Sequence, residues 1–373
     1  MSQVFPAHWD VLPFSLAVKD ATSEYSKLQK SEYLEQGRFP IVDQGQQNFG
    51  GYTDDESVVS LGGCPAVVFG DHTRIFKFID EPFCLGADGA KVLEPKVELD
   101  KKFLFYYLSS LNIESAGYSR HFKFLKENVV PVPPLPEQKR IAAILDKADA
   151  IRRKRQQAIQ LADDFLSAQF LQKFGDPKDS PFGSRSLKDV ALKVTDGAHF
   201  TPTYVDSGIP FLRVTDINRG EVDWSKVKYI PLEEHQELIK RCKPEKGDVL
   251  YSKNGTIGVP RLIDWDQEFS IFVSLCLIKP NPNYLRGRYL YSFLQTPFAL
   301  KQATQKAKSA TVTNLHLVEI KEIKLPVPSL AIQDEWIDFV DNFGCMRARL
   351  IESLNTSNDA FNSLSQKAFS GML

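Results

Sequence analysis

The chain has 373 residues, which is too long for one ordinary hydrophobic core and favours two domains of typical size. Its 43% hydrophobic and 25% charged residues are typical of a globular protein, and its formal net charge of -1 excludes an indiscriminate polycation but not a basic patch. The five cysteines are scattered without a CxxC pair, which argues against zinc and disulfides. Without a signal pattern or a long apolar stretch, we expect a cytoplasmic protein.

The first module, residues 1–133, is predicted to consist of short strands and turn-rich loops. The segments CPAVVFGD (64–71) and RIFKFID (74–80) are rich in β-branched and aromatic residues and are bounded by Gly, Pro or Asp, which is typical of strands. The segment KKFLFYYLSSL, from Lys101, has a helical pattern instead. The sequence therefore predicts a mixed α and β module.

A proline-rich turn, PVPPLPEQKR from Pro131, ends this module and passes directly into a helical pattern. Apolar residues recur at i, i+3, i+4 and i+7, and Pro136 suits the first helical turn. The segment FGDP, from Phe174, supplies a glycine and a proline where a helix would end. The pattern predicts a helix over residues 134–176, on the order of 60 Å long, whose apolar stripe needs an equally long partner.

The second module, residues 177–328, has the same organisation. The segments GDVLYSK (247–253) and SIFVSLCLI (270–278) are predicted strands, and RGRYLYSFLQ, from Arg286, is a predicted helix. A second long amphipathic pattern begins at about Ser329, a suitable N-cap residue. We expect a helix over residues 329–373 that is nearly as long as the first.

The two halves of the chain are related by an internal repeat. The segment FLKENVVPVPPLPEQKRI aligns with EIKEIKLPVPSLAIQDEW without a gap, so that Pro131 falls on Pro326 and Gln138 on Gln333. A constant offset over about fifty residues indicates a duplication of module plus helix. We predict an α+β fold in which two mixed α/β modules are joined by two long antiparallel coiled-coil helices, with a pseudo-two-fold repeat. The alternative is two unrelated domains, each ending in a helix on its own core, but such helices are usually shorter.

The loops of both modules combine amide, hydroxyl and cationic side chains with glycine. Such side chains suit contacts to DNA base edges and phosphates, although ordinary solvated turns have a similar composition. The candidate DNA-binding residues of the first module are Gln44, Gln46, Gln47, Asn48, His72, Arg74, Lys77, Ser119, Arg120, His121 and Lys123. Those of the second module are His199, Lys253, Asn254, Thr256, Arg261, Lys306, Lys308, Thr313 and Asn314.

Signals for catalysis are weak. The segment NPNY (281–284) resembles the Asn-Pro-Pro-Tyr motif of adenine methyltransferases, but no glycine-rich cofactor loop accompanies it, and a turn between strand and helix is the better interpretation. The six histidines lack metal-ligand spacing, although His199 could pair with an acid as a general base. The run RRKR (152–155) is typical of a solvated helix face. We predict no catalytic, metal or cofactor site.

Taken together, the residues resemble one family, the specificity (S) subunits of type I restriction-modification systems. The resemblance is carried by PVPPLPEQKRIAAIL and by three further segments: FGDHTRIFKFID…FCLGADGAKVL (69–93), TDGAHFTPTYVDSGIPFLRVTDI (195–217) and GDVLYSKNGTIGVPRLI (247–263). It covers nearly the whole chain, including the order module, helix, module, helix. One departure is the second proline turn, which has Ser329 and Ala331 in place of prolines.

This resemblance implies a subunit without catalytic activity that recognises double-stranded DNA. Each module would be a target-recognition domain for one half of a split DNA site. The paired helices would space the halves and dock two methylase (M) subunits, and restriction (R) subunits would join the complex. The expected localisation is cytoplasmic, and no membrane partner is expected.

Two other functions stay open from the sequence alone. The chain could be a self-contained DNA methyltransferase or nuclease with unrecognised catalytic motifs, which cofactor binding by the isolated chain would reveal. It could also be a helical-bridge interaction protein without a DNA role, in which case salt-sensitive binding of random duplex DNA would be absent.

Overall fold

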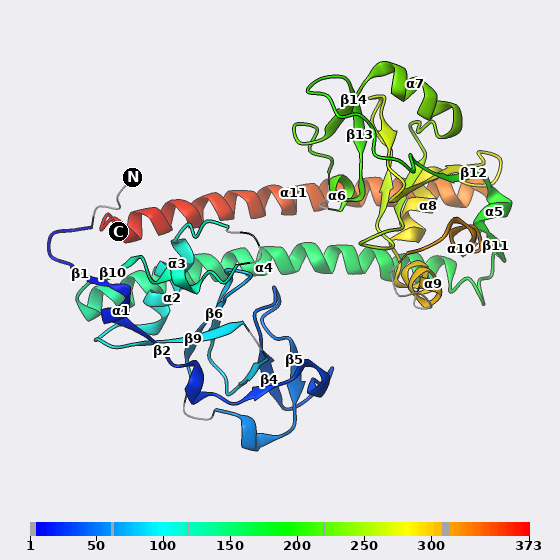
Figure 1. Cartoon of the computed structure of the whole chain (residues 1–373). Helices are drawn as coiled ribbons and strands as arrows, with labels where there is room; N and C mark the ends of the chain where they lie inside the picture. Colours follow the sequence, from blue (N-terminus) through cyan, green and yellow to red (C-terminus); the bar gives the residue numbers. More distant parts are fainter. Residues whose placement is uncertain are drawn as a thin grey trace. The chain divides into compact units, whose positions relative to one another are not determined.

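The computed structural model describes residues 5–373 apart from 61–62, 88, 116, 118, 219–220 and 308–313. The chain divides into two compact units (Figure 1). Unit 1 comprises Met1–Gln156 and Glu352–Leu373, and unit 2 comprises Gln157–Ile351. Each unit therefore holds one module together with parts of both long helices. Within the described residues, no helix is long and apolar enough to cross a membrane.

The described strands of unit 1 form three sheets. The first is antiparallel, in the order β2 (Val18–Asp20), β9 (Ala90–Pro95), β6 (Ala66–Gly70) and β7 (Phe76–Ile79). The second has the order β3 (Lys27–Leu28), β8 (Cys84–Gly86), β4 (Phe39–Val42) and β5 (Gly51–Thr53), and its β3–β8 and β4–β8 pairs are parallel. The third pairs β1 (Asp10–Pro13) with β10 (Val129–Val132).

Unit 2 repeats this topology in its described strands. Its antiparallel sheet has the order β12 (Ala191–Asp196), β18 (Leu275–Pro280), β15 (Val249–Ser252) and β16 (Pro260–Leu262). Its second sheet has the order β14 (Lys228–Ile230), β13 (Ile209–Leu212) and β17 (Ser270–Ile271), again with one parallel pair. Its third pairs β11 (Ser184–Ser186) with β19 (Lys324–Pro326). The matching strand orders confirm the predicted repeat.

The helices complete the two modules and the bridge. Those of the first half are α1 (Phe14–Ala17), α2 (Lys101–Ser110), α3 (Phe122–Leu125) and α4 (Leu135–Phe174), with short 3-10 turns at Thr22–Glu24, Lys30–Glu32 and Glu56–Val58. Those of the second half are α5 (Leu187–Val190), α6 (Val214–Ile217), α7 (Leu232–Arg241), α8 (Gly287–Leu294), α9 (Pro297–Ala307), α10 (Leu317–Lys321) and α11 (Leu330–Phe369). Helices α4 and α11 have 40 residues each, as their apolar patterns predicted.

One strand prediction was wrong. The segment 270–278 is not a single strand, because β17 pairs with β13 in one sheet and β18 pairs with β15 in another. A turn separates them, closed by a hydrogen bond from the Leu275 amide to the Phe272 carbonyl (2.9 Å). Both strands are buried, so the apolar run continues through the turn and hides it from a periodicity argument.

In unit 1, the first half of α4 pairs with the last part of α11. The guanidinium of Arg155 donates to the Ser353 carbonyl (2.5 Å) and to the Ser357 hydroxyl. One turn earlier on α4, Arg152 lies over the ring of Phe361, 4.3 Å from its centroid. Earlier residues of α4 meet later residues of α11, so the two segments are antiparallel. The basic run therefore joins the helices here and is more than a solvated face.

In unit 2, the second half of α4 pairs with the beginning of α11 in the same antiparallel sense. Arg347 donates to both carboxylate oxygens of Asp163, at 2.6 and 3.1 Å. The rings of Phe165 and Phe343 stack with centroids 5.5 Å apart. The antiparallel pairing predicted from the apolar stripes is thus present in each unit.

Each module buries its last helix against both long helices. In unit 1, Tyr107 of α2 packs on Phe369 of α11, with ring centroids 5.3 Å apart, in a core that also includes Leu145 of α4. In unit 2, Phe170 of α4 packs on Tyr289 of α8 and on Trp336 of α11, at 5.3 Å each. The core of each module is therefore continuous with the helix pair.

A buried glutamine joins the first module to α4. Gln138 is fully buried one turn into the helix. Its amide nitrogen donates to the carbonyls of Pro133 (2.7 Å) and Glu98 (3.1 Å), and its amide oxygen accepts from the backbone of Asp100 (2.7 Å), the N-cap of α2. One side chain thus fixes the proline turn, the start of α2 and α4 together.

Gln333, which the repeat places on Gln138, makes the equivalent contacts in unit 2. It is also fully buried, donates to the carbonyls of Pro328 (3.0 Å) and Tyr284 (2.8 Å), and accepts from the backbone of Arg286 (2.8 Å). We call these two sets of contacts the glutamine clamps. The second turn has fewer prolines, but its clamp is the same.

Replacing Gln138 by Ala should lower the free energy of unfolding by about 2–4 kcal/mol, because two carbonyls and one amide lose their buried partners. Urea unfolding monitored by circular dichroism measures this loss. The control is Gln157→Ala on an exposed position of the same helix, which should change the value by less than about 0.5 kcal/mol. Equal effects of the two substitutions would contradict a structural role of the clamp.

Candidate nucleic-acid interface

Two of the predicted loops of unit 1 meet at the turn between β6 and β7. The backbone carbonyl of Gln44 accepts from the Thr73 hydroxyl (2.6 Å). Its side-chain oxygen accepts from the His72 amide (3.2 Å). The loop after β4 is therefore docked on this turn, and the half-buried Gln44 acts as a connector between the two loops.

Lys77 of β7 holds the same loop from below. Its ammonium is buried and donates to the carbonyls of Asp43 (2.7 Å) and Asn48 (3.3 Å), with the Asp43 carboxylate 3.7 Å away. Burial lowers the pKa of Lys77, and the Asp43 charge opposes this effect. Between the two anchored carbonyls, Gln46 and Gln47 are exposed.

A third loop joins this turn through His121. Both the backbone amide and Nδ1 of His121 lie 2.9 Å from the Asp71 carbonyl, and the Phe122 amide donates to the Asp71 carboxylate (2.7 Å). His121 is buried, whereas Arg120 and Lys123 beside it are exposed. Three predicted loops therefore converge on one turn, and their buried members hold the exposed ones in place.

Arg74 has the most unusual backbone in this cluster. It lies in the left-handed region (φ 62°), which side chains other than glycine rarely adopt, and its guanidinium donates to the Ile113 carbonyl (2.8 Å). Arg74 is exposed, and the neighbouring Ser119 is half-buried. The turn thus presents a cation at a fixed position on the loop cluster.

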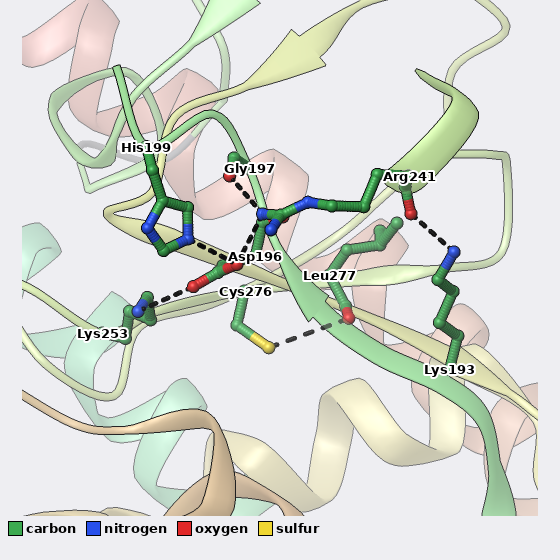
Figure 2. A network of polar contacts seen from close by, with 8 residues as sticks. All are labelled: Lys193, Asp196, Gly197, His199, Arg241, Lys253, Cys276 and Leu277. Carbon is green, nitrogen blue, oxygen red and sulfur yellow. Dashed lines mark hydrogen bonds and ion pairs between the residues drawn. The ribbon is translucent and has the colours of Figure 1, made fainter. Parts of the chain in front are cut away.

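In unit 2 the hub is a buried carboxylate, Asp196, which is only 4% exposed (Figure 2). One oxygen accepts from His199 Nε2 (3.0 Å) and from Arg241 Nη2 (2.7 Å). The other accepts from the buried Lys253 ammonium (3.1 Å). Burial raises the pKa of Asp196, but the hydrogen bonds from His199 and Lys253 outweigh this effect and hold it below its ordinary value.

Lys253 also connects the loops of unit 2 through its backbone. Its carbonyl accepts from the Leu315 amide (2.9 Å), and its amide donates to the Ser274 carbonyl (3.0 Å). The next residue, Asn254, forms an isolated bridge with Asn314. The turn between β15 and β16 is therefore joined to the segment before α10, just as the β6–β7 turn is joined to the segment before α3.

The remaining candidates of unit 2 are more dispersed. Thr256 is exposed, and the half-buried Arg261 lies over the ring of Trp265, 5.5 Å from its centroid. Lys308 and Thr313 lie outside the described residues, as does the side chain of Lys306.

Sequence reasoning missed the two charged groups that organise this cluster. Arg241 ends α7, 45 residues from Asp196, and an arginine in the last turn of a helix has an ordinary explanation in the helix dipole. The Asp-Gly pair at Asp196 was the available signal, because Gly197 approaches the Ile271 carbonyl so closely that a Cβ would lie 1.9 Å from it.

The structure supports the interpretation of NPNY as a turn. The Asn283 amide donates to the Asn281 side chain (3.1 Å) and the Leu285 amide to the Asn281 carbonyl (2.8 Å), between β18 and α8. His199 does pair with an acid, but Asp196 also holds two permanent cations, which is the geometry of a structural hub. Among the described residues, no group of three His, Cys, Asp or Glu side chains could hold a metal ion.

The fold and the loop clusters define a chain with two similar modules, each with one candidate binding face. A family model, the type I restriction modification DNA specificity domain, matches residues 21–161 and 180–356. The chain belongs to this family. The two matched regions correspond to the two halves of the repeat.

Curated relatives have low sequence identity but long coverage. The chain is 24% identical over 332 residues to the type I restriction enzyme EcoBI specificity subunit of Escherichia coli, covering 79% of this chain and 70% of that protein. It is 20% identical over 373 residues to the MjaVIII specificity subunit of Methanocaldococcus jannaschii, covering 90% and 87%. These relatives are named specificity subunits, which supports that function over a self-contained methyltransferase or nuclease.

A solved structure shares the fold. The type I S subunit from M. genitalium is 18% identical, with a TM-score of 0.50, and the match covers 97% of this chain and 96% of that one. At this identity the likeness concerns the fold alone. It confirms the predicted architecture of two mixed modules and long helices.

Replacing Asp196 by Asn should destabilise unit 2 by about 3 kcal/mol at pH 7, because Lys253 loses the charge of its buried partner. The lowered pKa of Asp196 means that the wild type has this stability above about pH 4 and loses it as the pH falls through the folded-state pKa. The difference in unfolding free energy between the two proteins should thus be constant from about pH 8 to 5 and shrink below about pH 4.

Urea unfolding across this pH range measures the difference. Asp206→Asn, at an exposed position of the same unit, is the control and should change stability by less than about 0.5 kcal/mol. A difference between wild type and Asp196→Asn that does not depend on pH would contradict the ionised hub.

Proposed function

We propose that this specificity subunit reads a bipartite DNA target, with residues 1–133 and 177–328 as its two target-recognition domains. The observation that carries the proposal is the repeated module topology, with polar loops anchored together in each unit. Each module has its own core and its own loop cluster, so each can recognise its half-site independently.

Within each domain, the exposed loop residues are proposed to contact DNA and the buried ones to position them. In the first domain the proposed contacts are Gln46, Gln47, Asn48, Arg74, Ser119, Arg120 and Lys123, positioned by Gln44, His72, Lys77 and His121. In the second they are His199, Asn254, Thr256, Arg261, Lys306, Lys308, Thr313 and Asn314, with Lys253 as the positioning residue. Amides and cations on fixed loops suit base edges and phosphates.

The two helices, residues 134–176 and 329–373, are proposed to set the separation of the half-sites and to dock two M subunits. The proposal is supported by the clamps, which fix each module to the helix that follows it, and by apolar side chains left exposed on the helices of unit 2. These include Leu161 and Phe165 of α4 and Met346 of α11.

The wider assembly is proposed by analogy with the relatives. The chain would be a non-catalytic subunit in the cytoplasm that binds double-stranded DNA together with M subunits, and R subunits would join through the complex. The names of the relatives support this role.

Deleting one heptad from each helix should shorten the spacer of the recognised site without altering either half. Removing residues 154–160 together with 348–354 keeps Asp163 opposite Arg347 and preserves the antiparallel register. Seven residues span about 10 Å of helix, so the spacer should shrink by about three base pairs. Mapping methylated adenines in cells that express the shortened chain with its M subunits measures the spacer.

The control inserts a second copy of each of the two heptads, which should lengthen the spacer by a similar amount. A shortened chain that still directs methylation to sites with the original spacer would refute the role of the helices as a ruler.

A further inference from the structure

The guanidinium of Arg241 is fixed on one side and open on the other. Its Nη2 donates to the Asp196 carboxylate (2.7 Å), the Asp196 carbonyl (2.8 Å) and the Gly197 carbonyl (2.7 Å). In the part of the chain that the structure describes, all hydrogen bonds of this guanidinium run through Nη2, and the side chain is 55% exposed. Its Nη1 and Nε donors are therefore open to a ligand.

His199 is held in the same way by the same carboxylate. Its Nε2 contacts Asp196 (3.0 Å), whereas the side chain is 60% exposed. Figure 2 shows the imidazole and the guanidinium reaching Asp196 from two different segments. The two side chains thus direct nitrogen donors towards the surface from fixed positions.

The charges around Asp196 do not balance locally. One carboxylate serves Arg241, Lys253 and the imidazole of His199, and the Lys193 ammonium donates to the Arg241 carbonyl (2.5 Å). Glu237, the other acid nearby, has an ion-pair partner of its own in Lys240 on the same helix (2.5 Å). The cluster therefore retains excess positive charge, which favours an anionic ligand.

A cavity of about 340 Å³ lies beside these cations. His199 and Arg241 line it together with the apolar side chains of Phe200, Leu238 and Ile271. The lining contains no Asn, Gln, Ser or Thr among the described residues, so the side chains that usually read base edges are missing here. A cationic wall beside an apolar one instead matches a sugar–phosphate unit, with the phosphate on the cations and the deoxyribose against Phe200.

We propose that Arg241 and His199 form a preorganised clamp for one backbone phosphate of DNA bound to unit 2, with Asp196 as its positioning residue. The inference rests on the proposed function, namely that residues 177–328 read DNA. A phosphate contact of this kind sets the register in which the neighbouring loops meet the bases. Because Asp196 already orders both side chains, little conformational freedom is lost when the phosphate binds.

The test uses the chain assembled with its M subunits and a duplex carrying the mapped recognition sequence. Neutral methylphosphonates replace single backbone phosphates across both half-sites, and binding is measured for each duplex. With the wild type, one position in a single half-site should be sensitive to both Arg241 and His199, and its neutralisation should weaken binding about tenfold.

Arg241→Gln should weaken binding about tenfold for cognate and random duplexes alike, and should reduce the salt dependence by about one phosphate. It should no longer respond to the methylphosphonate at the sensitive position. His199→Ala, which removes an exposed side chain and so serves if Arg241→Gln does not fold, should give a smaller loss at that same position. Lys240→Gln is the matched control on α7 and should keep the wild-type response.

Three results would overturn the clamp: no sensitive position common to Arg241 and His199, a variant that keeps the full wild-type response, or a variant that changes the preferred base at one position. The last result would mean base reading by Arg241. If the wild-type complex does not discriminate the mapped site from random duplex, the proposed function itself fails, which is a separate outcome.

Discussion

The buried side-chain amide of a glutamine is the constraint on which both halves of this protein depend. Gln138 and Gln333 each satisfy two carbonyls and one backbone amide at the point where a module passes into a long helix. Because these groups have no access to water, any movement of the module relative to its helix would leave them unpaired. The proline turns limit the backbone at the same place, and the clamp works equally well where the second turn has fewer prolines.

Further contacts strengthen each junction in a different way. In unit 1, Lys102 of α2 pairs with Asp146 of α4 (3.0 Å), and in unit 2 Arg286 makes a two-pronged contact with Asp334 of α11 (2.8 and 3.1 Å). The ion pairs are partly exposed and contribute modestly, whereas the shared aromatic cores supply most of the burial. A module fixed in this manner can transmit the geometry of its helix to its loops, which is what a molecular ruler requires.

Much of the architecture could be predicted from the sequence, because the apolar stripes of α4 and α11 and the repeated proline turns are local patterns. The loop chemistry was less predictable. Lys77 and Lys253 look like ordinary loop cations in the sequence, and only the fold shows that both are buried supports. Arg241 was missed because its role depends on Asp196, a residue of another strand, and no spacing rule connects the two.

The central claim is that each clamped module reads one half-site by itself. The most direct measurement is a map of methylated adenines in cells whose chain has residues 177–328 replaced by the corresponding residues of another family member. The account predicts a new sequence in one half of the site, with the other half and the spacer unchanged. Changes in both halves, or a continuous recognition sequence, would contradict it.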